Sequence, residues 1–267
     1  MKRQPILQLG LLALGILFLA ARASINRVLA SLGEPPPYRI SGPGVSVIVP
    51  TLEEQKYLPK LLASIANQTY EPIETIICDQ SDSVGKRLTK EIASRYGATV
   101  VDLEERNLSA ARNTGVQYAR YDTVAIVDAD MILSHPWIEK ASGAIDLGYV
   151  TAIGKKTVYD SMVASMGYLL YSFMIQPTMT YGAVAVNKAA FQDIGGYDIA
   201  LPFGLGEDVD FGLRMSRRFG VSRMALLDIL AGTSGRRWKA KGFSSTPWDE
   251  VVIRKQLAGE QVRLLLP

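Results

Sequence analysis

Short apolar stretches alternate with amphipathic stretches along most of this chain, a pattern typical of buried strands followed by surface helices. The runs that read as strands are Val45–Val49, Glu74–Cys78, Thr99–Leu103 and Thr123–Val127. Helical periodicity between them predicts helices within Tyr57–Ala66, Arg87–Tyr96 and Leu108–Tyr118. Buried strands that alternate with helices pair in parallel. We therefore predict an α/β fold with a mostly parallel, doubly wound sheet and flanking helices.

The amino terminus carries a longer apolar run. No charged residue occurs from Gln4 to Ala21, and at about 1.5 Å per residue such a helix just crosses the hydrocarbon of a bilayer. We predict a single-pass membrane anchor over residues 1–24. A cleaved signal peptide is the alternative, because Ala21-Arg22-Ala23 has small residues at the spacing of a cleavage site. Arg22 within that site favours the anchor, and the flanking charges lean toward a cytoplasmic carboxyl-terminal domain.

Glycine and proline divide the remaining chain. The segments Gly33–Pro37 and Ser41–Gly44 interrupt regular structure. We expect a juxtamembrane linker over residues 25–43, a folded domain over residues 44–240 and a tail over residues 241–267 whose apolar residues suit an amphipathic helix.

Composition excludes several mechanisms. The net charge of +3 and pI near 8.9 suit a protein near anionic lipid or phosphate but are too small to indicate nucleic-acid binding. One cysteine and one histidine cannot form an intrachain disulfide or a Cys/His zinc cluster. His135 could serve a Ser-His-Asp triad, but no G-x-S-x-G motif supplies the serine. Carboxylates are therefore the candidate bases and metal ligands.

Polar residues follow each predicted strand where it ends. They are Thr51 and Glu53, Asp79 and Asp82, Glu104 and Glu105, and Asp128 and Asp130. Each one alone would equally suit a turn or a helix cap. Together they favour a ligand site, because ligands of open α/β sheets bind outside the carboxyl ends of the strands. Asp128 and Asp130 can hold a divalent cation, although the same spacing recurs at Asp208-Val209-Asp210.

Six motifs occur in an order and spacing that resemble family 2 glycosyltransferases. They are Val45–Glu54, Ile76–Asp82, Asn107–Gly115, Val127–Met131, Gly195–Asp198 and Gly206–Arg214. The resemblance implies a GT-A fold, a nucleoside diphosphate sugar donor carrying UDP or GDP, a Mn²⁺ or Mg²⁺ cofactor, and inversion at the anomeric carbon.

The resemblance also implies roles for individual residues. Those implied to bind the nucleotide and its metal are Pro50, Thr51 and Glu53 at the nucleoside pocket, Asp79 at the base, Arg112 near the nucleotide, Asp128 at ribose or metal, and Asp130 at the metal. For Arg112 the alternative is an exposed helix arginine. The segment Asp79–Asp82 departs from the usual DDGS-like signature, which affects the expected base contacts.

The resemblance places the catalytic base at Asp208, beside Glu207, in the first turn of a predicted helix. Helix capping is the alternative for both residues. Arg236 and Arg237 are candidates to bind the donor diphosphate or an acceptor phosphate, or alternatively lipid headgroups. The apolar run Met162–Met174 lies where such enzymes bind acceptors, but its length and pattern favour a core helix.

The sequence thus predicts an inverting, metal-dependent enzyme that moves one sugar to a lipid-linked or cell-envelope acceptor at a membrane, without a nucleic-acid partner. One alternative is a sugar nucleotidyltransferase, but the chain after the first strand is acidic where a triphosphate needs cations. The other is a catalytically inactive membrane scaffold with the same fold.

Overall fold

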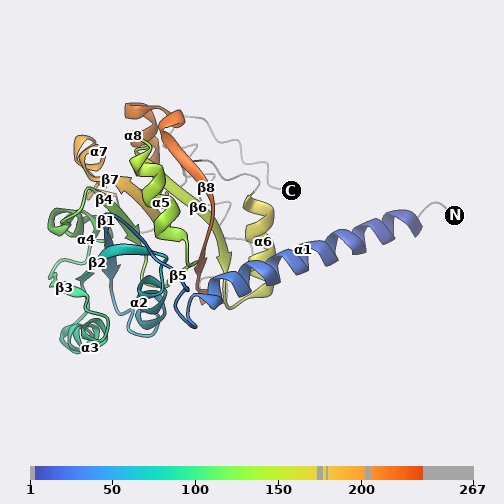
Figure 1. Ribbon diagram of the computed structural model, residues 1–267, viewed down its shortest axis with the longest axis horizontal. Coiled ribbons are helices and arrows are strands. Elements are labelled where there is room, and N and C mark those ends of the chain that lie inside the picture. Colours follow the sequence, from blue (N-terminus) through green and yellow to red (C-terminus); the bar gives the residue numbers. More distant parts are fainter. Residues whose placement is uncertain (1–3, 173–176, 179, 202–205, 237–267) are drawn as a thin grey trace.

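The computed structural model describes residues 4–172, 177, 178, 180–201 and 206–236 (Figure 1). The helices are α1 (Gln4–Ala30), α2 (Leu58–Ala66), α3 (Ser83–Ser94), α4 (Leu108–Tyr118), α5 (Trp137–Asp146), α6 (Met162–Ser172), α7 (Lys188–Asp193) and α8 (Glu207–Phe219), with a 3-10 turn at Val221–Arg223. The strands are β1 (Ile40–Thr51), β2 (Tyr70–Asp79), β3 (Thr99–Asp102), β4 (Thr123–Val127), β5 (Met131–Leu133), β6 (Thr151–Val158), β7 (Ala183–Asn187) and β8 (Met224–Thr233). All four predicted strands and the three helices predicted between them are present, while the helix expected in the 241–267 tail lies outside the described residues.

The strands form one sheet in the order β3-β2-β1-β4-β7-β6-β8-β5. The first four are parallel, as predicted. The β7 strand then runs antiparallel to both of its neighbours, β4 and β6. The β8 strand is parallel to β6, and β5 pairs antiparallel with β8 at the edge. The fold is therefore α/β with a parallel half and a mixed half.

Helices cover both faces of the sheet and bury an apolar core on each. On one face α2 contributes Leu58, Leu61, Leu62 and Ile65, which follow the spacing of an amphipathic helix. The opposite core contains Ala111 and Val116 of α4 together with Phe211 and Met215 of α8. These two cores fix α4 and α8 against the sheet, and both helices carry candidate site residues.

The predicted polar residues do gather at one edge of the sheet. In the parallel register Thr51 lies opposite Asp79, and Asp79 lies opposite Asp102. The β4 strand neighbours β1 and ends at Val127, directly before Asp128. The carboxyl ends of β1, β2 and β4 therefore present their following residues side by side.

The α1 helix is longer than the predicted apolar run and projects from the domain (Figure 1). It continues to Ala30, and β1 begins at Ile40, so both ends of the expected 25–43 linker belong to regular elements. Ala21, Ile25 and Val28 are buried against the domain, whereas residues 10–20 are exposed apart from the half-buried Leu17. Gly10–Ala30 is long and apolar enough to cross a membrane by length and composition.

Two helical glycines provide a test of how tightly α4 must pack. A Cβ at Gly115 would lie 2.1 Å from Ile48 Cγ2, whereas a Cβ at Gly143 in α5 would meet nothing within 4 Å. We expect Gly115→Ala to destabilise the chain by about 1–3 kcal/mol through overpacking. The matched Gly143→Ala should stabilise it by up to about 1 kcal/mol through helix propensity. Thermal unfolding of the two variants checks this, and equal melting temperatures would contradict it.

Candidate active site

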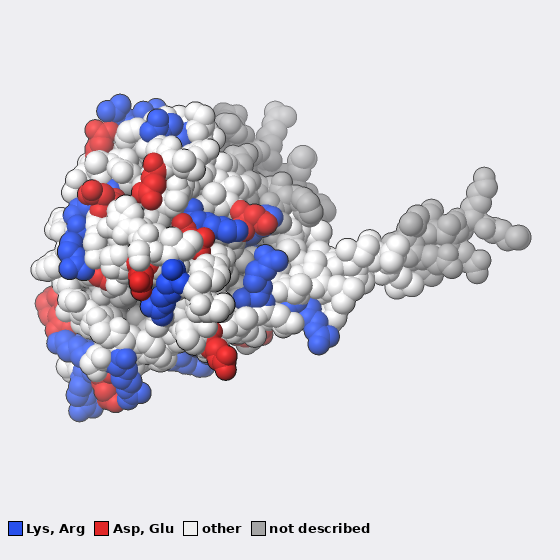
Figure 2. Space-filling model, viewed as in Figure 1, with Lys and Arg blue, Asp and Glu red and all other residues white. Residues whose placement is uncertain are grey.

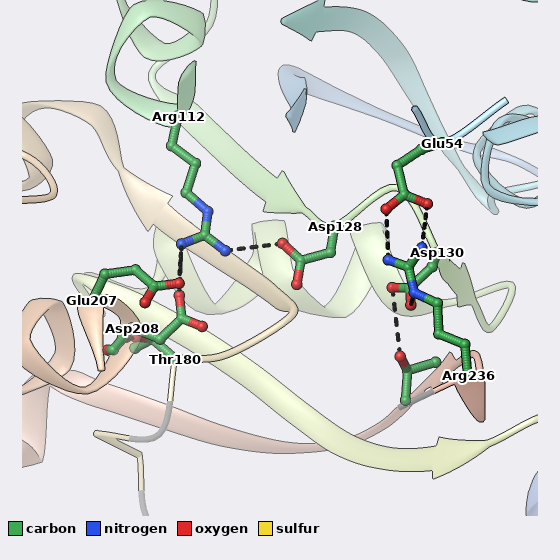
Figure 3. Close-up of polar contacts among 9 residues, drawn as sticks. Glu54, Arg112, Asp128, Asp130, Thr180, Glu207, Asp208 and Arg236 are labelled. Atoms are coloured by element: carbon green, nitrogen blue, oxygen red, sulfur yellow. Dashed lines mark hydrogen bonds and ion pairs between the residues drawn. The ribbon is translucent and has the colours of Figure 1, made fainter. Parts of the chain in front are cut away.

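A buried arginine joins carboxylates from two segments, the end of β4 and the start of α8, at the carboxyl edge of the sheet (Figure 3). The Arg112 side chain on α4 is 2% exposed. Its Nη2 donates to Asp128 Oδ1 at 2.9 Å, and its Nη1 donates to Asp208 Oδ1 at 2.9 Å and lies 3.5 Å from Glu207 Oε1. Its guanidinium lies 4.8 Å from the centre of the Tyr197 ring. Arg112 is thus a buried, charge-paired residue and not the exposed helix arginine of the alternative interpretation.

The first two residues of α8, Glu207 and Asp208, both direct their carboxylates toward Arg112. Gly206 has a φ of 102°, a left-handed conformation that favours glycine, and it precedes the helix without a side-chain cap. Thr180 Oγ1 donates to the Asp208 carbonyl at 2.6 Å and holds this turn. Glu207 and Asp208 therefore contact Arg112 instead of capping the helix. Asp210 pairs separately with Arg214, at 2.7 Å.

Burial and neighbouring charge tune the ionisation of this cluster. Burial raises the pKa of Asp208 to about 7, with Glu207 and Asp128 adding to the rise and Arg112 opposing it. Burial lowers the pKa of Arg112, but Asp208 and Asp128 more than offset this effect and hold it above its usual value. Arg112 stays charged, while Asp208 can gain or lose a proton near neutral pH, as a general base must.

A second arginine binds the other aspartate of the pair. Arg236 Nη1 and Nη2 donate to the two Glu54 oxygens at 2.7 and 2.6 Å, and its Nε lies 3.3 Å from Asp130 Oδ2. Ser234 Oγ donates to the same Asp130 oxygen at 2.7 Å. Burial raises the pKa of Glu54, Arg236 lowers it, and Asp130 and Asp128 raise it further. Arg236 therefore lies beside Asp130, its phosphate-binding role stays a prediction, and Arg237 lies outside the described residues.

The residues proposed for the nucleoside lie at the ends of β1 and β2. Asp79 is fully buried, and its Oδ1 accepts from Thr51 Oγ1, Ser81 Oγ and the Ser81 backbone N–H at 2.6–3.0 Å. Its Oδ2 has no hydrogen-bond partner among the described residues. Glu53 has a φ of 56°, and its Oε1 accepts from the Asp82 backbone N–H at 2.8 Å. The roles of Pro50, Thr51, Glu53 and Asp79 stay predictions.

Several residues of the site escaped the sequence analysis. Glu54 follows Glu53 directly, and only the turn at Glu53 sends Glu54 toward Asp130 and Arg236. Lys156 of β6 lies 4.0 Å from the centre of the Tyr181 ring, and its charge lowers the pKa of Asp208. Thr180 gives no local motif at all. Of these residues, only Glu54 could have been found from the sequence, through its place beside Glu53.

Asp128 and Asp130 have the donor chemistry that a divalent cation takes at a nucleotide site. Within the described part of the chain, no three His, Cys, Asp or Glu side chains form a group that could hold a metal. Mg²⁺ in nucleotide sites takes one or two carboxylates and completes its shell with phosphate and water, and Mn²⁺ also prefers oxygen ligands. Asp128 and Asp130 supply such a pair, and Glu54, Glu207 and Asp208 add to the acidic excess over Arg112 and Arg236.

The sequence model of the family described as "Glycosyl transferase family 2" matches residues 46–188. The chain is similar to the glycosyltransferase GlyA of Streptococcus pneumoniae, with 34% identity over 140 residues, covering 51% of this chain and 18% of that protein. It is 30% identical over 181 residues to dolichol-phosphate mannosyltransferase of Pyrococcus furiosus, covering 64% and 49%. The match to the glycosyltransferase AglE of Haloferax volcanii is 29% over 120 residues, covering 42% and 38%. The chain therefore matches less than half the length of each of these relatives.

Solved structures share the fold. The chain superposes on S. aureus TarS 1-349 with a TM-score of 0.58 at 18% identity, covering 84% of this chain and 67% of that one. It superposes on the glucosyl-3-phosphoglycerate synthase of Mycobacterium tuberculosis, crystallised with Mn²⁺ and UDP, with a TM-score of 0.56 at 17% identity, covering 83% and 82%. The fold predicted from the sequence is confirmed.

Proposed function

Because the chain belongs to glycosyltransferase family 2, we propose that it transfers a single sugar from a nucleoside diphosphate sugar to an acceptor at a membrane or cell envelope. The observation that carries the proposal is the Arg112 cluster. It places Asp208, whose pKa is near 7, one guanidinium away from Asp128. A candidate base and a candidate diphosphate-metal site therefore lie side by side, and this arrangement supports a displacement at the anomeric carbon.

The donor nucleotide would bind at the ends of β1 and β2. The free Asp79 Oδ2 can accept from the imide N–H of uracil or the corresponding edge of guanine, while Thr51 and Ser81 hold Oδ1. A buried carboxylate oxygen without a partner is costly, and a ligand donor would satisfy it. The solved structures with UDP favour a uridine nucleotide over a guanosine nucleotide.

The diphosphate would lie over Asp128 and Asp130. These aspartates would hold Mn²⁺ or Mg²⁺, which supplies positive charge that stabilises the departing diphosphate. Arg236 beside Asp130 can donate to phosphate oxygens when it releases Glu54. Arg112 supports this site from beneath by fixing the Asp128 carboxylate.

The transfer itself would be a single displacement with inversion. The acceptor oxygen forms a bond to the anomeric carbon while the bond from that carbon to the diphosphate oxygen breaks, and the electron pair leaves with the diphosphate. Asp208 accepts the proton of the acceptor hydroxyl in the same step. An acceptor that is already an ionised phosphate has no such proton, and Asp208 would then serve to position it.

A membrane acceptor is supported by α1 and by the relatives. The apolar part of α1 can cross a bilayer and would anchor the domain on the cytoplasmic side. One relative is a minor teichoic acid biosynthesis protein of Bacillus subtilis, with 32% identity over 106 residues, and another is the dolichol-phosphate mannosyltransferase. We therefore propose a lipid-linked or cell-envelope acceptor.

Donor binding tests this function directly. The full chain, purified in detergent with Mn²⁺, should be melted with UDP-sugars and GDP-sugars in turn. At a donor concentration of 100 times Kd, donor binding adds about 2.7 kcal/mol to the free energy of unfolding. For a domain of this size this raises the melting temperature by roughly 5–10 °C. We expect one nucleotide class to produce this shift and EDTA or Asp130→Ala to remove it.

The controls separate binding from general charge effects. Asp146→Ala changes an acidic residue at the end of α5, outside the site, and should keep the full donor shift. A shift that persists in EDTA would contradict the metal role of Asp130. Absence of any shift with every sugar nucleotide, in a chain that melts cooperatively, would contradict the proposed donor class.

A further inference from the structure

The α1 helix docks directly behind the Asp130 site. Val28 packs in one buried cluster with Ile132, Tyr159 and Leu230. Gly232 of β8 allows this approach, because a Cβ there would lie 2.6 Å from Val28 Cγ1. The next two residues of the chain, Thr233 and Ser234, are the ones whose hydroxyls contact Asp130. The α1 helix thus packs through Val28 against Gly232, the residue just before the segment that contacts Asp130.

The α6 helix reaches the same segment from a second direction. The Gly235 backbone N–H donates to Asp160, two residues before α6 begins. The helix packs against both α1 and β6, and its inner residues Ala164 and Ser165 are buried. Figure 1 shows α6 crossing the root of α1, where α1 meets the domain. Both helices therefore form one corner of the domain next to the site.

The outer side of this corner is apolar and exposed. Val163 and Leu170 of α6 are 67% and 57% exposed, and Met166 is partly exposed between them at helical spacing on the same side. The α6 sequence contains no charged residue. The α1 helix, which packs against α6, also exposes apolar residues, and they are Leu11, Leu12, Leu14, Ile16, Phe18 and Leu19. Figure 2 shows the described part of the projecting helix without acidic or basic side chains, while charged side chains gather over the domain.

We propose that this corner rests on a lipid bilayer, with α1 crossing the hydrocarbon and the outer side of α6 lying in the interface. The inference rests on the membrane anchor of the proposed function and adds a second contact that fixes how the domain sits. The bilayer is the occupant that fits, because the α6 surface is uncharged and α6 packs against α1. Arg22 and Arg27 are exposed where α1 meets the domain and suit the headgroup layer.

This contact with the bilayer determines how far the active site lies from the hydrocarbon. Residues 4–20 of α1 precede the first docked residue, Ala21, and measure about 26 Å, close to the hydrocarbon thickness of about 30 Å. Val28 is seven residues further, or about 10 Å along the axis. The Asp130 segment behind Val28 would therefore lie at headgroup level. The acceptor class that fits is an amphiphile whose reacting oxygen lies next to the bilayer surface.

The single native cysteine makes the test clean. Cys78 is fully buried, and burial raises the pKa of its thiol to about 12, so it should not react with thiol probes. Val163→Cys and Leu170→Cys place a reactive thiol on the outer side of α6. Val84→Cys is the matched control, a 54% exposed valine on α3 at the opposite end of the sheet. Leu14→Cys reports on the span itself. Each full chain would be labelled with an environment-sensitive fluorophore in phosphatidylcholine vesicles containing phosphatidylglycerol.

Lipids carrying a nitroxide on the headgroup or deep in the acyl chain then report depth. The headgroup nitroxide should quench roughly half or more of the emission at positions 163 and 170, because interfacial helices lie about 5–10 Å into the boundary. The deep nitroxide should quench position 14, and neither should quench position 84.

Quenching at position 14 without quenching at positions 163 and 170 would overturn the proposed contact of α6 with the bilayer but not the anchor. Blue-shifted but unquenched labels at 163 and 170 would show that protein covers the face and would also overturn it. Unquenched label at 14 would overturn the anchor, and with it the membrane part of the proposed function.

Discussion

Replacing Asp208 with asparagine should lower kcat by about three orders of magnitude, the usual contribution of a general base. Asparagine keeps an oxygen that can accept from Arg112 Nη1, so the cluster should stay assembled. Donor binding does not need the base, and the melting shift with the preferred sugar nucleotide should persist. Steady-state kinetics with a hydroxyl acceptor measures the first effect, and thermal unfolding measures the second.

The pH dependence of kcat/KM tests the role of Asp208 independently. Since the pKa of Asp208 is raised to about 7 and the base must be deprotonated, kcat/KM should rise with pH and level off above that value. The raised pKa also means that folding favours the protonated carboxyl, so its contribution to stability declines as pH rises from its ordinary pKa to about 7.

Asp210→Asn is the matched control for both measurements. It removes a carboxylate from the same helix turn, but one that pairs with Arg214 instead of Arg112. It should keep both the rate and the pH profile. A loss of less than tenfold in Asp208→Asn, or the same loss in Asp210→Asn, would rule out Asp208 as the base.

The second large effect is expected at Arg112. Arg112→Met keeps most of the side-chain volume but leaves Asp128, Glu207 and Asp208 close together without their counter-charge. Breaking a buried ion pair from one side costs about 3–5 kcal/mol, or roughly 10 °C in melting temperature for a chain of this size. Activity should fall with stability, since the same residue fixes the base and the metal site.

Arg112→Lys keeps the charge and tests the role if the methionine variant does not fold. Lysine cannot reproduce the two-pronged contact by which Arg112 joins Asp128 and Asp208. In the native chain Arg112 opposes the rise in the pKa of Asp208. The rising limb of the pH profile should therefore move above pH 7 in the lysine variant. Arg218→Met is the control, a 61% exposed arginine on α8 paired with Asp193, and should cost at most about 1 kcal/mol. An Arg112→Met chain as stable as Arg218→Met would contradict the structural role of the cluster.

The parallel half of the sheet could be predicted because its signals are local. Strands β1, β2 and β4 are buried apolar runs bounded by polar turns, and the helices between them follow amphipathic spacing. The mixed half lacks such signals. Strand β6 carries Lys155 and Lys156 in its middle, and β5 has only three residues. Their places depend on pairing with distant partners such as β8.

The site shows the same division. Asp128, Asp130 and Asp208 belong to short motifs, so the sequence points to them. The connection of Asp128 to Asp208 through Arg112 does not appear in the sequence, because Arg112 on α4 and Asp208 on α8 are 96 residues apart in the chain. The place of Glu54 in the site, which the sequence analysis did not predict, has a similar origin. A single backbone conformation at Glu53 decides which of two adjacent carboxylates faces Asp130.

The unbroken path of α1 from its exposed part to its docked part has a mechanical consequence. No proline follows Pro5 within α1, and Ala21, Ile25 and Val28 fasten its last turns to the domain, so a membrane-crossing α1 would join the domain without a proline kink. A chain anchored in this way would tilt and rotate as one body. Its encounters with acceptor would then occur by lateral diffusion, and turnover would follow the surface density of acceptor in the bilayer instead of its bulk concentration.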